Sequence, residues 1–106
     1  MTDVGSLASE FQDTLVAGCD ECWRACRYNP SYFRRLVLQH GGVAAAKQLI
    51  RSEQPSEGLA RLWECRRLDL SMEAEMLQPR WRLLFTEDEL AVARRRLAEL
   101  GYDPSG

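Results

Sequence analysis

The sequence has little of what most catalytic and export motifs require. Its 106 residues include one histidine, His40, and one lysine, Lys47, so nearly all of the 14 basic residues are arginines. No apolar run approaches the roughly 20 residues that cross a bilayer. The first residues lack the basic and apolar segments of a secretory signal. These absences predict a cytoplasmic protein with no membrane association.

The composition indicates one all-α domain. Apolar residues make up 45% of the chain and the net charge is −2, so the sequence is neither disordered nor strongly basic. Apolar residues recur at helical spacing, and no strand-length alternation is present. We expect five or six short helices in a single compact domain over residues 6–102, with flexible ends at 1–5 and 103–106. The expected helices span about residues 6–28, 30–40, 43–51, 56–67, 71–78 and 86–100.

Several of these helices have clear start signals. Thr86 and Glu89 match a capping box, and Phe85 with Leu90 is spaced for a hydrophobic staple. Ser71 is a candidate N-cap for the helix before Pro79. The pair Asn29-Pro30 predicts an N-cap followed by the first helical residue of the next helix, which we expect to bury Tyr32, Phe33, Leu36 and Val37.

Part of the chain resembles a small helical domain that recurs in uncharacterised bacterial proteins. The segments that carry this resemblance are NPSYF at 29–33, GGVAAAK at 41–47, GLARLW at 58–63, LDLSME at 68–73 and LFT at 84–86, followed by ARRRL at 93–97. It covers roughly residues 28–102. The resemblance implies a bacterial cytoplasmic module and assigns no activity, cofactor or site.

Four cysteines, Cys19, Cys22, Cys26 and Cys65, form the most conspicuous cluster of chemically reactive residues. Without an export signal we expect them to be reduced. Cys22 and Cys26 fall on the apolar side of the first helix, where free cysteine behaves as a small hydrophobe. Zinc would need four ligands, and Cys65 would complete them only if its helix packed beside the first. We therefore favour core packing and expect no metal and no cofactor.

No catalytic constellation stands out. His40 precedes Gly41-Gly42, where an imidazole suits the negative end of a helix, although a Cys–His dyad with Cys19 or Cys26 is an alternative. Asp69 and Glu73 are explained by turn and cap chemistry, and Glu75 by a solvated surface. The sequence therefore predicts a protein that is not an enzyme.

Charge is distributed unevenly along the chain. The first 21 residues carry five acidic residues and no basic one, whereas residues 22–52 carry only basic ones. This basic block, Arg24–Arg51, has two interpretations: it contacts nucleic-acid phosphate, or it neutralises the acidic flanks within the fold. We favour neutralisation. The phosphate-binding alternative would use Arg24, Arg27, Arg34, Arg35, Lys47 and Arg51.

Three apolar side chains lie outside the main helical stripes and are candidates for a partner surface. Val16 and Trp23 are seven residues apart on one flank of the first helix, and Leu38 lies opposite Leu36 on the second. Tryptophan beside arginine is typical of an interface hot spot; the alternative is that a neighbouring helix covers Trp23. The sequence favours a module that acts by protein–protein interaction or self-association, with nucleic-acid binding or regulation as the alternative.

Overall fold

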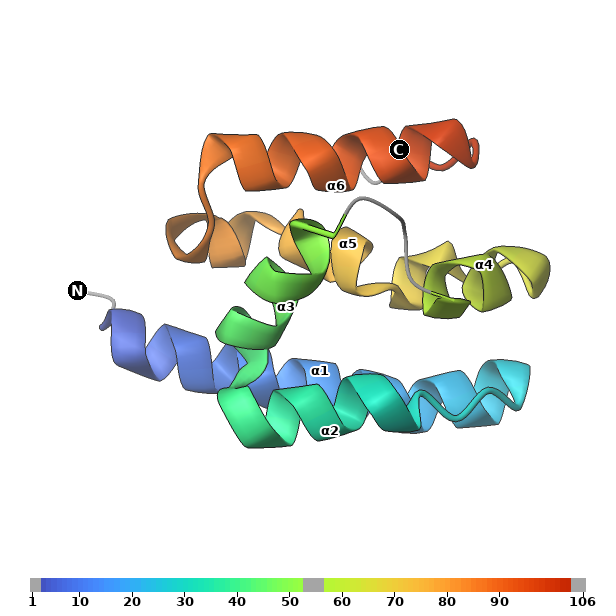
Figure 1. Cartoon of the computed structure of the whole chain (residues 1–106), viewed down its shortest axis with the longest axis horizontal. Coiled ribbons are helices and arrows are strands. Elements are labelled where there is room, and N and C mark those ends of the chain that lie inside the picture. The colour runs from blue at the N-terminus through green and yellow to red at the C-terminus, as the bar shows by residue number, and fades with distance from the viewer. Residues whose placement is uncertain (1–2, 53–56, 104–106) are drawn as a thin grey trace.

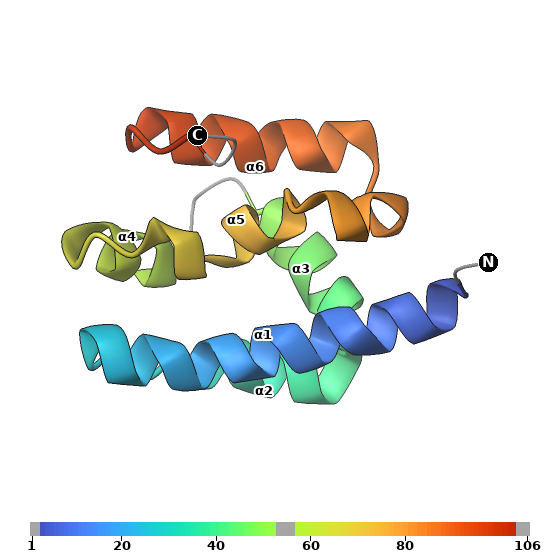
Figure 2. The same ribbon diagram turned by 180° about the vertical axis from the view of Figure 1, so that it is seen from behind.

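The computed structural model describes residues 3–52 and 57–103, and within them all regular secondary structure is helical. The elements are α1 (Val4–Cys26), α2 (Ser31–His40), α3 (Gly42–Ile50), α4 (Glu57–Glu64), the 3-10 helix η1 (Leu68–Leu70), α5 (Met72–Met76), the 3-10 helix η2 (Pro79–Leu84) and α6 (Glu87–Glu99). α1 and α2 form one outer layer and α6 the other, with α3, α4 and α5 between them (Figures 1 and 2). The predicted all-α single domain is confirmed.

Local capping explains where most helices begin. The Asp3 carboxylate accepts hydrogen bonds from the backbone N–H groups of Gly5 and Ser6, so α1 begins at Val4, slightly before the expected start. Ser71 caps α5 by accepting from Ala74 N at 3.1 Å, as predicted. Such caps satisfy N–H groups that have no partner within their own helix.

The capping box at α6 is confirmed in both directions. Glu89 N donates to Thr86 Oγ1 at 3.2 Å, and Thr86 N donates to Glu89 Oε1 at 2.8 Å. Phe85 and Leu90 are buried in the same apolar cluster, as expected for a hydrophobic staple.

The start of α2 differs from the prediction. Pro30, not Asn29, occupies the N-cap, and Tyr32 is 61% exposed rather than buried. Leu36 and Val37 do face the core. Because other helices cover α2 mainly along one side, only part of the wide apolar stripe inferred from its sequence is buried.

Two glycines set the junction between α2 and α3. Gly41 has φ +92°, a conformation that L side chains rarely adopt, and it ends α2. A Cβ on Gly42 would lie 2.9 Å from Gln12 Cα, so only glycine allows α3 to approach α1 this closely. Gly42 N also donates to Gln12 Oε1 at 3.1 Å. The Gly-Gly pair therefore determines how α3 crosses α1.

The core consists of two apolar clusters. The larger one centres on Phe11, whose ring makes edge-on contacts with Trp81 and Phe85, each with centroids 5.3 Å apart. The smaller one joins Cys22 to Leu59 and Leu62 of α4 and to Leu97 of α6. The two clusters hold opposite ends of α1 against the middle layer.

Candidate functional site

The predicted partner residues lie on two neighbouring helices, Val16 and Trp23 on α1 and Leu38 on α2. Asp20 of α1 and Arg34 of α2 form an ion pair at 3.0 Å. Trp23 lies one helical turn from Asp20, and Leu38 lies one turn from Arg34, so the two apolar side chains flank this ion pair. Trp23 is 50% exposed and Leu38 63% exposed. We call this region the Trp23–Leu38 surface.

The other features of this surface were only partly expected. Val16 is half-buried and packs against the larger core cluster, so only part of its side chain is exposed at this surface. No helix covers Trp23 fully; instead the Arg27 guanidinium lies 5.4 Å from the centre of its ring. This cation–π contact is a local interaction at an exposed site and is worth about 0.5–1 kcal/mol.

Half of the basic block is neutralised within the fold. Arg24 pairs with Glu21 at 3.1 Å, Arg34 with Asp20, and Lys47 with Glu89 at 2.7 Å. Arg27, Arg35 and Arg51 are exposed and are distributed over the ends of α1 and α3 and the middle of α2. The structure therefore does not gather all six cations into one patch.

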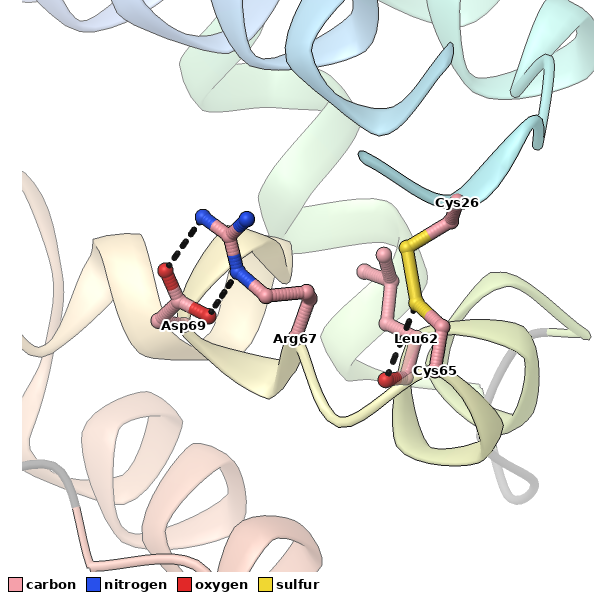
Figure 3. The surroundings of a disulfide bond; sticks show 5 residues. All are labelled: Cys26, Leu62, Cys65, Arg67 and Asp69. Atoms are coloured by element: carbon pink, nitrogen blue, oxygen red, sulfur yellow. Dashed lines mark hydrogen bonds and ion pairs between the residues drawn. A yellow bond between two sulfur atoms is a disulfide. The ribbon is translucent and has the colours of Figure 1, made fainter. Parts of the chain in front are cut away.

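The cysteines depart from the expectation that all four are reduced. Cys26, at the end of α1, is joined to Cys65, just after α4, in a disulfide with a Cα–Cα distance of 5.9 Å (Figure 3). Cys65 Sγ lies 3.6 Å from the carbonyl oxygen of Leu62. The Arg67–Asp69 ion pair belongs to the wider surroundings of the disulfide (Figure 3). The expectation of four free thiols was wrong because the pairing depends on how α4 packs against α1.

The two remaining cysteines, Cys19 and Cys22, are free and buried, in agreement with a core role. Burial raises the pKa of the Cys22 thiol to about 11. Burial also raises the pKa of Cys19, although Arg34 opposes the rise. Both thiols are therefore protonated at neutral pH, which makes them poor nucleophiles. In the described part of the chain, no group of three or more His, Cys, Asp or Glu side chains is placed to share a metal ion.

A cavity that the sequence did not indicate lies between α1, the start of α2 and the middle layer. Its volume is about 270 Å³, and it lies where the two core clusters meet. The cavity is partly open to solvent, and the exposed residues Tyr32 and Glu57 are part of its lining. We call it the central cavity; its apolar lining includes Leu15, Cys22, Leu59, Leu62, Leu70 and Met72.

Polar groups also line the central cavity. Glu73 and Arg96 form a buried ion pair at 3.3 Å, with side chains only 3% and 5% exposed. Burial raises the pKa of Glu73, although Arg96 opposes the rise. Glu75, expected on the solvated surface, is half-buried and accepts a hydrogen bond from Trp81 Nε1 at 2.7 Å. Sequence periodicity missed these contacts because each joins separate elements.

Arg96 also closes the end of α3. Its guanidinium donates hydrogen bonds to three backbone carbonyls, those of Leu49, Ile50 and Ser52. These carbonyls belong to the last turn of α3 and the residues just after it, where helical partners run out. His40 lies exposed at the end of α2, as the sequence suggested.

Comparisons with family models, with curated proteins and with solved structures find no match to this chain. The resemblance to a bacterial helical domain therefore stays a prediction. Among the described residues, no helix has both the length and the apolar character that a membrane span needs.

Proposed function

We propose that this chain is a non-enzymatic binding module that acts through contact with another protein at the Trp23–Leu38 surface. The observation that carries the proposal is the half exposure of Trp23 beside Arg27. Tryptophan and arginine are the residue types most enriched at interface hot spots. Exposed apolar residues mark a docking surface where they form a contiguous patch, and we infer that Trp23 and Leu38 form such a patch around the Asp20–Arg34 ion pair.

The charges around this surface favour an acidic partner. Arg27 and Arg35 are both exposed, and neither forms an ion pair within the described residues. Positive groups at the rim of an interface favour a partner with complementary negative charge. We therefore infer that the partner offers an apolar contact edged by acidic residues.

The test compares two tryptophans of equal exposure. Trp23 is 50% exposed on α1, and Trp63 is 51% exposed on α4, outside the surface. We expect Trp23→Ala to keep the circular dichroism melt of the parent and to lose partner capture or self-association, as measured by pull-down and light scattering. Trp63→Ala should retain both. Equal capture by the two variants would contradict the proposal, and so would unfolding of Trp23→Ala.

Nucleic-acid binding through the basic block is the alternative, and the internal ion pairs of Arg24, Arg34 and Lys47 argue against it. Cations already paired with carboxylates release fewer counterions on binding phosphate. We expect binding to DNA and RNA to be no tighter than about 10 µM at physiological salt. Sub-micromolar, salt-sensitive binding that Arg34→Glu with Arg35→Glu abolishes would favour the alternative.

We keep bacterial origin and a cytoplasmic location as parts of this proposal. The Cys26–Cys65 disulfide argues against the cytoplasmic part, because thiols in the cytosol are usually kept reduced.

A further inference from the structure

We propose that the central cavity binds a small apolar molecule that carries a protonated amine. This site is distinct from the Trp23–Leu38 surface, because neither Trp23 nor Leu38 lines the cavity. Protein binding and ligand binding can therefore be tested separately.

The size of the cavity sets the size of the ligand. An engineered apolar cavity of about 150 Å³ holds benzene, so about 270 Å³ suits a molecule of about ten non-hydrogen atoms. The lining is mostly leucine, methionine, aromatic and thiol groups, which favour an apolar body.

Gly18 provides independent support for an unfilled space. It lies within the 23-residue helix α1 and lines the cavity, and a Cβ built there meets no atom within 4 Å. Glycine inside a helix is destabilising relative to alanine. Close packing does not require glycine here, in contrast to Gly42, so the missing side chain leaves room in the cavity.

The charges that line the cavity set the charge of the ligand. Four carboxylates line it and only one cation does. Glu73 is paired with Arg96, and Asp69 is paired with Arg67 from outside the lining. This leaves two carboxylates, Glu57 and Glu75, without a cation among the described residues.

These two carboxylates are placed differently. Glu57 lines the cavity and is exposed, while Glu75 is half-buried and accepts a hydrogen bond from the Trp81 indole. Either carboxylate would attract a protonated amine, whereas a carboxylate ligand would be repelled. The acidic lining therefore favours a cationic head group on the apolar body.

Three probes with the same nine-carbon chain test the charge preference. Nonylamine, nonanol and nonanoate are titrated calorimetrically into the protein with its disulfide intact. We expect nonylamine to bind with a dissociation constant below about 100 µM, in keeping with its number of atoms. Nonanol should bind more weakly, and nonanoate at least about tenfold more weakly than the amine. Absence of nonylamine binding, or equal binding of the amine and the carboxylate, would overturn the proposal.

A cavity-filling variant locates the site. Gly18→Leu places a side chain in the open space and should raise the thermal midpoint, because leucine is a better helix former than glycine. It should also weaken nonylamine binding by more than about tenfold, because the cavity is then occupied. Ala17→Leu adds a similar side chain at the exposed neighbouring position and should leave binding unchanged. Equal binding by the two variants would show that the amine binds elsewhere.

A second variant tests the acidic lining without emptying the site. Glu75→Gln keeps an oxygen that can accept from Trp81 Nε1, and Glu57→Gln changes an exposed group. The double variant should bind nonanol as the parent does and should lose the preference for the amine over the carboxylate. A preference that survives in the double variant would refute the role of these carboxylates.

Discussion

The disulfide between Cys26 and Cys65 offers the sharpest test of the fold. It closes a loop with a sequence separation of 39 residues. In the chain-entropy description, a loop of that length restricts the unfolded state by about 4 kcal/mol. Small domains have a total free energy of unfolding of about 5–15 kcal/mol, so this is a large share. We expect reduction, or the double variant Cys26→Ala/Cys65→Ala, to lower the free energy of unfolding by about that amount.

The location of the disulfide explains why its removal should lower the free energy of unfolding. It ties the end of α1 to the end of α4, a helix of only eight residues. Helices this short are marginal without tertiary support. The remaining support for α4 comes mainly from Leu59 and Leu62 in the smaller core cluster.

The assay is urea unfolding of protein refolded under oxidising conditions, with and without reductant. Alkylation under denaturing conditions should find two thiols before reduction, Cys19 and Cys22, and four after it. The alanine double variant is the control, because its midpoint should not respond to reductant. A parent midpoint that is the same in both conditions, or four reactive thiols before reduction, would refute the reasoning.

Three further predictions concern caps and ion pairs. Thr86→Ala should lower the free energy of unfolding by about 1 kcal/mol, the usual cost of a lost N-cap; an unchanged denaturant midpoint would show that α6 begins elsewhere. Burial alone would raise the pKa of Glu89, but hydrogen bonds from Lys47 and the Thr86 backbone lower it overall. The ionised Glu89 carboxylate therefore stabilises the fold at neutral pH, and this stabilisation is lost as the pH falls below 4.5. In urea unfolding, Glu89→Gln should be less stable than the parent by about 1–2 kcal/mol at pH 7. The two proteins should have the same stability in acid. Arg96→Met should cost about 3–5 kcal/mol in urea unfolding, because it leaves Glu73 buried without its partner; a loss below 1 kcal/mol would contradict this.

Local signals predicted the helical fold well because they act within a few residues. The capping box at Thr86 and the cap at Ser71 involve partners three residues away. The stop at Gly41 depends on its own φ angle. Each such signal is complete in the sequence, and the structure reproduces each one.

Burial was harder to predict because it depends on neighbouring elements. Tyr32 has the spacing of a core residue, yet it is 61% exposed because α2 is an outer helix. Glu75 is of a residue type usually found at the surface, yet its carboxylate accepts a hydrogen bond from the Trp81 indole. The helix periodicity was correct in both regions, but it does not show which faces the other helices cover.

The two candidate sites differ in the same way: local sequence patterns indicated one of them and not the other. The Trp23–Leu38 surface was partly foreseen, because its two apolar residues depart from the periodicity of their own helices. The central cavity was not foreseen, since a space between helices has no pattern in the sequence. Gly18 was its one local sign: a glycine inside a helix, with no turn or close contact to require it, indicates room beside the backbone.

Arg96 shows why a run of like residues hides a structural role. Within Arg94-Arg95-Arg96, helical rotation directs each side chain to a different side, and the first two are exposed. Only Arg96 faces α3 and α5, where it pairs with Glu73 and donates to the carbonyls at the end of α3. A charge is tolerated in that interior because the ion pair and the carbonyls together satisfy it. The same pair lines the central cavity, so the residue that fastens α6 to α3 also neutralises one of the carboxylates at the proposed ligand site.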